Sequence, residues 1–198
     1  EAIAREGVTS TLFVPPMMLP IIDYPDIHKY DISSLQMMLY GGVAMPEGML
    51  RRMTEIFGDI FMPMLGITET GASVLLPPLM EGPWEKVNRP GSCGKEVIGL
   101  EVRLVDEEGK DVAPRQIGEI LARGDKVMKG YWNMPEETAK ALEGGYFHTG
   151  DLATKDEAGY YYLSGRKKDV ITTAGKQVFS PEIEDAISLH PAVSEVTV

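Results

Sequence analysis

The chain has 198 residues, with 19 Lys and Arg against 30 Asp and Glu, which gives a formal net charge of −11. This acidic balance disfavours a protein that binds nucleic acid through bulk positive charge, or one that attaches to an anionic membrane surface. Hydrophobic residues make up 43% of the chain and charged residues 25%, an ordinary globular balance that excludes wholesale disorder.

Both ends of the sequence resemble cuts inside secondary-structure elements. Residues 1–6 are typical of the last turns of a helix that stops at Gly7. Residues 193–198 alternate apolar and polar like a strand that has just begun. We therefore expect the chain to be part of a longer protein. Because a shortened sheet exposes strand edges that normally pair, we also expect self-association into a homo-oligomer.

A strand–helix–strand pattern occupies residues 35–65. Two apolar runs, residues 35–40 and 60–65, flank an amphipathic helix predicted over residues 46–57. The apolar positions of this helix recur at i, i+1, i+4, i+7 and i+8, as in a helix that covers a sheet. Such a βαβ unit joins parallel strands, so the sequence predicts a partial parallel sheet.

Glycines, a hydroxyl and a carboxylate follow these two predicted strands. Gly41-Gly42 comes after the first run, and the string Gly66-Ile67-Thr68-Glu69-Thr70-Gly71 follows the second. We expect both beyond the carboxyl ends of parallel strands, the edge where open α/β sheets bind ligands. Backbone N–H groups and a Thr hydroxyl can bind phosphate, and a carboxylate suits Mg²⁺. Alone, the longer string is more typical of a tight turn with a solvated glutamate.

Antiparallel strands dominate the second half. Alternating apolar and polar residues predict a strand over residues 100–104, and a second short strand is expected over residues 118–123. Residues 151–154 and 160–163, on either side of the turn 155–159, are typical of a β-hairpin. Helices are expected over residues 135–142 and from Ser180, an N-cap that Pro181 follows at the first helical position.

A second polar constellation follows one of these strands. The string His148-Thr149-Gly150-Asp151 precedes a hairpin, and Arg166 lies fifteen positions beyond Asp151. A carboxylate that accepts from a diol is the ordinary way to hold a ribose, and an arginine beyond a hairpin could return to the same ligand. A surface aspartate and a basic turn explain the same residues equally well. We expect a structural role for His148, because nothing nearby in the sequence activates it.

Cys93 is the only cysteine in the sequence, and it indicates the redox setting. A single cysteine excludes an internal disulfide and fits a reducing compartment, so we expect a cytoplasmic location. We expect Cys93 itself to be a small buried or loop residue. No apolar run approaches the roughly 18 residues of a membrane span, so no membrane span is expected. The net negative charge predicts that nucleic acid is not a partner.

Eight short strings, in this order and spread over nearly the whole chain, resemble the adenylate-forming superfamily of acyl-CoA synthetases, aryl-CoA ligases, luciferases and peptide-synthetase adenylation domains. They are residues 40–45, 66–70, 89–94, 118–120, 129–133, 149–151, 165–169 and 181–184. The resemblance implies a mixed α/β fold, with a partial parallel βαβ sheet plus a small antiparallel β-subdomain. Residues 1–165 would be the C-terminal part of the large N-terminal domain, and residues 166–198 the start of a small C-terminal α+β domain.

The resemblance also implies an adenine-binding side of the site. Gly41, Gly42 and Val43 would lie along the adenine and the acyl pocket, and Gly66 would belong to the same cofactor-binding set. The family usually stacks an aromatic residue on adenine where this chain has Leu65, so we expect less stacking energy here. Val43 begins a Val-Ala pair where the family usually has Ala-Pro, which changes the pocket wall.

The same resemblance implies contacts with the phosphates and the ribose. Thr68 would contact phosphate, Glu69 would hold Mg²⁺, and both would be catalytic. Asp151 would bind the ribose hydroxyls, and Arg166 would contact the same nucleotide.

Two further positions match the family's moving parts. Lys168 would be the catalytic hinge about which the small domain swings between adenylation and thioester formation. Gly175 would lie on the loop that lines the pantetheine tunnel of coenzyme A in the second state.

The implied reaction is that of an acyl-CoA synthetase for a medium- or long-chain fatty acid, using ATP, Mg²⁺ and coenzyme A. A carboxylate attacks ATP to give acyl-AMP and pyrophosphate, and coenzyme A then displaces AMP. The family's phosphate loop and C-terminal catalytic lysine are absent from the 198 residues, so we expect the isolated chain to be inactive. Two alternatives stay open: an aryl- or amino-acid-adenylating relative, and a non-catalytic nucleotide-binding or interaction module.

Overall fold

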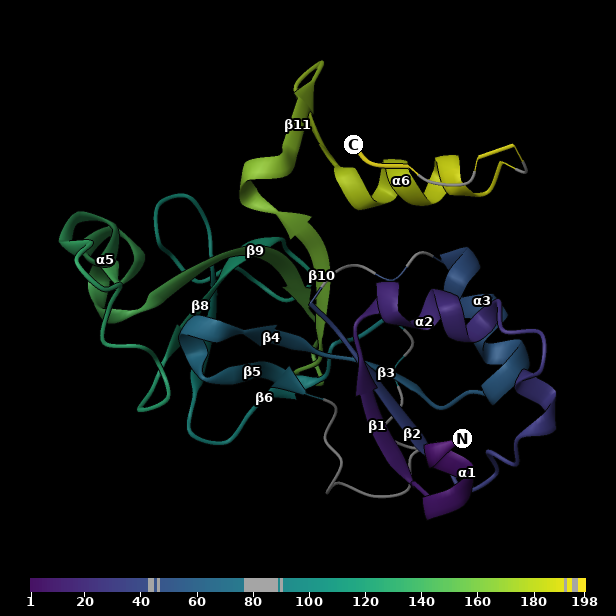
Figure 1. Ribbon diagram of the computed structural model, residues 1–198. Coiled ribbons are helices and arrows are strands. Elements are labelled where there is room, and N and C mark those ends of the chain that lie inside the picture. Colours follow the sequence, from purple (N-terminus) through teal and green to yellow (C-terminus); the bar gives the residue numbers. More distant parts are fainter. Residues whose placement is uncertain (43–44, 46, 77–88, 90, 191, 194–195) are drawn as a thin grey trace. The chain divides into compact units, whose positions relative to one another are not determined.

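The computed structural model describes residues 1–198 except 43–44, 46, 77–88, 90, 191 and 194–195 (Figure 1). The described residues form two compact units, one made of residues 1–63 and 183–198 and the other of residues 64–182. Within the described part of the chain, no helix is long and apolar enough to cross a membrane.

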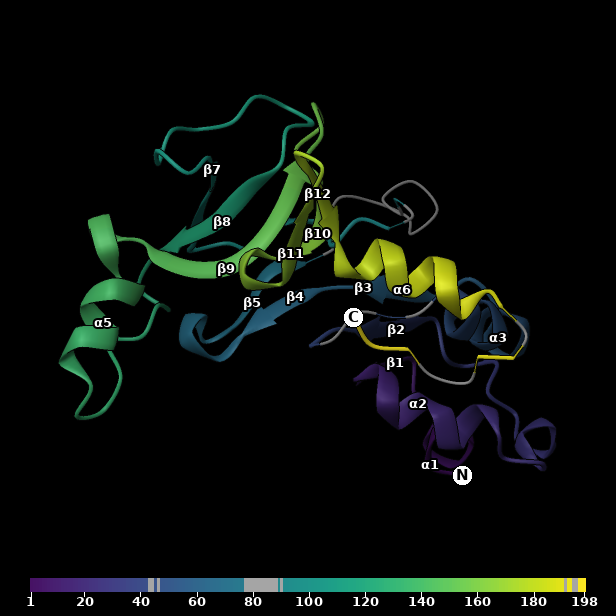
Figure 2. The ribbon, with the colours of Figure 1, turned by 90° about the horizontal axis from the view of Figure 1, so that it is seen from above.

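The first unit is built on a parallel sheet of three strands. Its strands are β1 (Ser10–Phe13), β2 (Met37–Tyr40) and β3 (Phe61–Pro63), in that spatial order. The helix α2 (Pro15–Ile22) connects the first two strands and α3 (Glu47–Phe57) connects the second and third (Figure 2). The predicted βαβ unit and its parallel sheet are therefore confirmed.

The core of this unit lies between the sheet and its helices. Met18 of α2, Met38 of β2 and Met53 of α3 are fully buried in one cluster, with Phe61 of β3 beside them. The apolar stripe predicted for α3 is thus the face that packs on this cluster. Before the sheet, the short helix α1 (Ala2–Glu6) ends, as predicted, at a glycine with left-handed backbone, Gly7.

The second unit contains the antiparallel strands. One sheet joins β4 (Leu65–Ile67), β5 (Ala72–Leu76) and β6 (Lys95–Glu96). A larger sheet has the order β10-β9-β8-β7, with bounds β7 (Glu101–Val105), β8 (Gly118–Arg123), β9 (Phe147–Lys155) and β10 (Tyr161–Arg166). A separate hairpin consists of β11 (Val170–Thr173) and β12 (Lys176–Phe179).

Short helices complete the chain. The α-helices are α5 (Pro135–Ala141) and α6 (Ser180–Ser188), the latter beginning at the predicted Ser180. Single 3₁₀ turns are η1 (Ile27–Lys29), η2 (Thr68–Thr70), η3 (Glu143–Gly145) and η4 (Lys167–Asp169).

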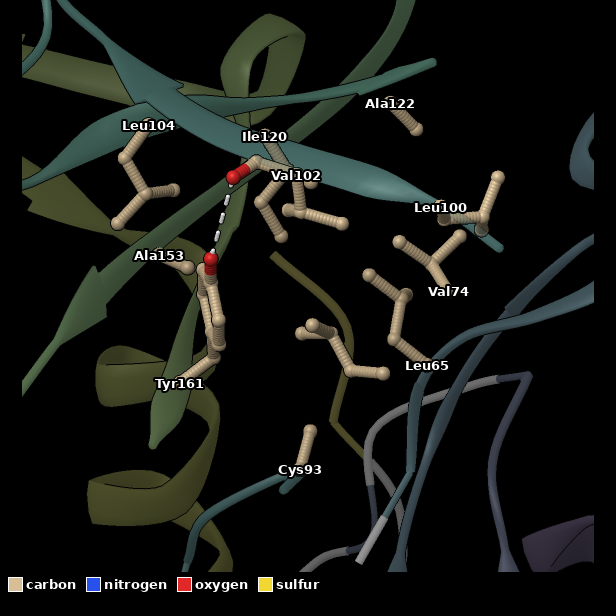
Figure 3. Packing of buried hydrophobic residues seen from close by; sticks show 11 residues of the cluster. Leu65, Val74, Cys93, Leu100, Val102, Leu104, Ile120, Ala122, Ala153 and Tyr161 are labelled. Carbon is tan, nitrogen blue, oxygen red and sulfur yellow. Dashed lines mark hydrogen bonds between the residues drawn. The ribbon is translucent and has the colours of Figure 1, made fainter. Parts of the chain in front are cut away.

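The core of the second unit joins its two larger sheets. Figure 3 shows Leu65 and Val74 of the smaller sheet packed with residues of β7, β8 and β9. Tyr161 is fully buried there, and its hydroxyl donates to the carbonyl oxygen of Val102 at 3.4 Å. Cys93 belongs to the same core, as expected, and burial raises the pKa of its thiol to about 12.

Two local predictions are wrong. The apolar run 60–65 is not one strand, because β3 ends at Pro63 and β4 begins a different sheet at Leu65. The turn η2 ends at Gly71, whose left-handed backbone (φ 67°) returns the chain so that β5 pairs antiparallel with β4. Gly66 therefore lies within an antiparallel strand, not beyond a parallel one.

The prediction of a strand over residues 193–198 is also wrong for the residues that the structure describes. Residues 193 and 196–198 form no strand. Alternation alone makes no strand, because the backbone groups of a strand need a neighbouring strand to pair with. The expected domain boundary after residue 165 stays a prediction.

Gly124 sits at a position where the backbone leaves no room for a side chain. It follows β8 with φ 156°, and a Cβ there would lie 2.2 Å from the carbonyl oxygen of Gly99. We expect Gly124→Ala to lower the free energy of unfolding by about 3 kcal/mol, measured by urea titration. Gly109→Ala is the matched control, since its φ is 76° but its Cβ meets nothing within 4 Å. Equal losses in the two variants would contradict the clash as the cause.

Candidate functional site

Asp151 lies in an irregular stretch of β9. Against the three residues 149–151 of β9, the neighbouring strand β8 places the single residue Ile120. Gly150, in the middle of this bulge, has the left-handed φ of 70° that favours glycine. Bulges bend a strand and re-aim its side chains, and they are common beside active sites.

Side chains replace the ladder hydrogen bonds that the bulge removes. The Thr149 hydroxyl donates to the Ile120 carbonyl oxygen at 2.8 Å and accepts from the Asp151 N–H at 3.0 Å. The Gly150 N–H donates to Oε1 of Glu119 at 3.3 Å. The conformation that presents Asp151 is therefore fixed by two buried side chains of the sheet itself.

The Asp151 carboxylate is buried but only half satisfied. Its Oδ1 accepts from Nη1 of Arg166 at 2.5 Å. Its Oδ2 is buried and accepts no hydrogen bond from the described residues. Burial raises the pKa of Asp151, and the nearby charge of Glu119 adds to this, although Arg166 opposes the shift. An unpaired buried carboxylate oxygen is suited to accept hydroxyl groups of a ligand.

Arg166 connects this carboxylate to the η2 turn. Its side chain is half exposed, and its pKa is raised by the hydrogen bond to Asp151, with further contributions from the charges of Asp169 and Glu69. The charge of Glu69, in the η2 turn, is thus close enough to Arg166 to contribute to this shift.

Glu69 is held by residues from a different part of the chain. Its Oε1 accepts from the Tyr131 hydroxyl at 2.8 Å, and its carbonyl oxygen accepts from the Met128 N–H at 2.7 Å. The hydrogen bond to Glu69 raises the pKa of Tyr131. Thr138 of α5 anchors Tyr131 in turn, by accepting its N–H at 2.9 Å. Residues 129–133 are among the strings that resemble the family, but the sequence alone indicates no role for Tyr131.

The remaining nucleotide-side residues divide between the two units. Gly41 and Gly42 directly follow β2 in the first unit, as predicted, while Val43 lies outside the described residues. Leu65 is buried in the core of the second unit, and Gly66 pairs with Ser73. The adenine contacts expected for these positions stay predictions.

Lys168 and Gly175 follow the larger sheet. Lys168 is exposed in the turn η4, directly after β10. Gly175 (φ 75°) and Ala174 (φ 49°) form the two-residue turn of the β11–β12 hairpin. Positive φ at both central residues is the twist that such tight hairpins require. The hinge and tunnel roles of these two residues also stay predictions.

The described residues contain no group of three or more His, Cys, Asp or Glu side chains that could hold a metal ion. Mg²⁺ needs no such cage, because it commonly binds through one or two carboxylates, waters and the phosphates of a substrate. The partly exposed carboxylate of Glu69, beside the exposed Thr68, fits that mode of binding.

Comparisons with known proteins identify the family of the chain. The AMP-binding enzyme family matches residues 1–132. The medium/long-chain-fatty-acid–CoA ligase FadD8 of Mycobacterium tuberculosis is 39% identical over 196 residues, which are 99% of this chain and 34% of that protein. The long-chain-fatty-acid–CoA ligase of Bacillus subtilis is 35% identical, over 95% of this chain and 33% of its own length. The chain therefore spans about a third of these curated relatives.

Solved structures give the same answer for the fold. ATP-bound MatB from Rhodopseudomonas palustris superposes with a TM-score of 0.84 and 32% identity, covering 100% of this chain and 38% of that one. The anthranilate CoA ligase AuaEII in complex with anthranoyl-AMP gives 0.81 and 31%, covering 98% and 36%. The chain belongs to the AMP-binding enzyme family, and so to the adenylate-forming acyl-CoA ligase superfamily. The resemblance and the mixed α/β fold class are confirmed.

Proposed function

We propose that the protein carrying this chain is an ATP-dependent acid–thiol ligase that converts a carboxylate and ATP to acyl-AMP and pyrophosphate, then transfers the acyl group to coenzyme A. The observation that carries the proposal is the buried Asp151 carboxylate, whose Oδ2 has no partner among the described residues while Oδ1 is held by Arg166. A ribose diol supplies the donors that this oxygen lacks.

The other residues take complementary parts in the proposed reaction. Thr68 binds a phosphate oxygen, and Arg166 offers to the same nucleotide the guanidinium N–H groups that do not bind Asp151. Glu69 holds Mg²⁺ together with the phosphates, and the ion, when bound, neutralises charge that builds up on them. Lys168 is the hinge for the second half-reaction, and Gly175 lies along the path of the pantetheine arm.

A medium- or long-chain fatty acid is the proposed substrate. Support comes from the fatty-acid–CoA ligases of Mycobacterium tuberculosis and Bacillus subtilis, at 39% and 35% identity. An aryl acid is the second candidate, because the feruloyl-CoA synthase of an Amycolatopsis species is 36% identical and AuaEII is an anthranilate CoA ligase. A cytoplasmic location and a homo-oligomeric state stay predictions.

Carboxylate-dependent exchange between ATP and pyrophosphate, measured on the full-length protein, tests the proposal. We expect exchange with fatty acids of medium or long chain, and no exchange without a carboxylate. Exchange with aryl or amino acids alone would replace the substrate but keep the chemistry. A folded protein that binds ATP and is silent with every acid would refute ligase activity and favour a non-catalytic nucleotide-binding module.

A further inference from the structure

Three residues lie close to the buried carboxylate of Glu119: His148, Gly150 and Lys167. Its Oε1 accepts the Gly150 N–H at 3.3 Å and lies 3.6 Å from Nδ1 of His148. Its Oε2 accepts from Nζ of Lys167 at 2.8 Å. The Glu119 side chain is 8% exposed, whereas that of Lys167 is 52% exposed. The Glu119 carboxylate is thus buried, and the ammonium group that pairs with it belongs to the half-exposed side chain of Lys167.

Two of these partners stand next to residues of the proposed site. Gly150 directly precedes Asp151 in the bulge, and Lys167 directly precedes Lys168 in η4. A buried carboxylate is costly unless it is paired and hydrogen-bonded, so the contacts with Gly150 and Lys167 both stabilise Glu119 in its buried position. One side chain therefore links the backbone beside Asp151 to the backbone beside Lys168.

Electrostatics couples the same residues. The charge of Glu119 contributes to raising the pKa of Asp151, which shows that the two carboxylates interact. Lys167 neutralises Glu119 and so limits this repulsion. Removing Lys167 would leave the charge of Glu119 facing Asp151 with only dipolar partners and His148.

We propose that Glu119 is a positioning residue that ties the Asp151 bulge to Lys167, so that nucleotide binding at Asp151 and the conformation of the segment before Lys168 are coupled. The proposal rests on the proposed function, since it assumes that Asp151 meets the nucleotide. It assigns a role to the string Gly118-Glu119-Ile120, which the resemblance alone left without one.

Four single variants and one double variant of the full-length protein test this coupling. Lys167→Met removes the charge but keeps the aliphatic stem, and Lys167→Arg restores a cation. Glu119→Gln removes the charge, which breaks the ion pair with Lys167 and leaves only a weaker, neutral acceptor for the Gly150 N–H. Lys29→Met is the matched control, because Lys29 pairs with Asp26 at the same N–O distance of 2.8 Å, but with both side chains exposed.

The first readout is the affinity for AMP by titration calorimetry. We expect Lys167→Met to weaken AMP binding by roughly threefold to tenfold and Glu119→Gln by at least as much. Lys167→Arg should restore affinity, and Lys29→Met should not change it. The double variant at 119 and 167 should be no weaker than Glu119→Gln, because Lys167 acts through Glu119. Additive losses, or an unchanged Lys167→Met, would overturn the proposal.

The second readout is amide hydrogen exchange, which does not depend on activity. Exchange at Gly150 should speed up in Glu119→Gln, and AMP should protect the amides of residues 167–168 in the wild type more than in that variant. If the wild type binds no AMP, the proposed function fails, while exchange at Gly150 still decides whether Glu119 holds the bulge. If Glu119→Gln does not fold, the surface variants at Lys167 decide the coupling by their AMP affinities.

Steady-state kinetics separates positioning from a general loss of structure. With adenylation established, Lys167→Met should raise the KM for ATP by roughly threefold to tenfold while kcat changes less than about twofold. A smaller fraction of active enzyme in Lys167→Met, with the KM for ATP unchanged, would instead indicate misfolding and would overturn the proposal.

Discussion

Asp151→Asn should weaken ATP binding by about 100-fold. The isosteric amide removes the charge that lets the buried carboxylate accept from two donors, and hydrogen bonds to charged groups are worth about 1.5–3 kcal/mol. Oδ2 of Asp151 accepts no hydrogen bond from the described residues. The substitution should therefore most weaken the binding of a ligand hydroxyl at this oxygen. Titration calorimetry with ATP on the full-length protein measures the effect.

The same substitution should cost no stability at neutral pH. Burial raises the pKa of Asp151 above its ordinary value of 3.8, despite the hydrogen bond from Arg166. A carboxyl with a raised pKa in the folded state favours folding fully below 3.8, and this contribution is lost as the pH rises through the folded-state pKa. The unfolding free energy of Asp151→Asn relative to wild type should therefore increase between acid pH and neutrality, as measured by urea titration.

Asp111→Asn provides the control for both measurements. Asp111 accepts from Nε of Arg103 at 2.8 Å, but its side chain is 67% exposed. We expect no loss of ATP affinity in this variant, and at neutral pH only the small loss of stability that an exposed ion pair gives. A stability loss at neutral pH in Asp151→Asn, matching that of Asp111→Asn, would show that the ion pair outweighs burial at Asp151.

The Asp151–Arg166 pair was predictable because it is local. The two short runs 151–154 and 160–163, on either side of the turn 155–159, predict an antiparallel hairpin. In the structure, Arg166 pairs directly with Asp151 across β9 and β10, after a register shift beyond Leu163. The position of the turn brings the two residues close together, and the register shift then places them directly opposite each other.

Residues that act across long sequence separations could not be found in this way. Tyr131 bonds Glu69 from 62 positions away, and Glu119 meets Gly150 and Lys167 only through strand order and a bulge. No periodicity signals such contacts, because they depend on which strands become neighbours. The prediction of one strand over residues 60–65 was wrong for the same reason. The sequence pattern indicates an extended segment, but it does not indicate which strands that segment pairs with.

The η2 turn should dominate the rate of adenylation. We expect Glu69→Gln to lower kcat for acyl-AMP formation by about 100-fold or more, because a neutral amide holds Mg²⁺ less well, and the ion is what would neutralise the charge on the phosphates. The Mg²⁺ concentration for half-maximal rate should rise in parallel. Pyrophosphate exchange at increasing Mg²⁺ measures both quantities. Glu157→Gln, which alters an exposed ion pair with Arg115, should leave both unchanged.

Tyr131→Phe distinguishes orientation of Glu69 from its charge. The Tyr131 hydroxyl donates to Oε1 of Glu69 at 2.8 Å, so phenylalanine frees the carboxylate to rotate but keeps its charge. We expect a loss of about threefold to tenfold in kcat, in line with one hydrogen bond to a charged group. The double variant should resemble Glu69→Gln alone, since Tyr131 acts through Glu69. A full additive loss in the double variant would mean that Tyr131 contacts the reacting groups itself.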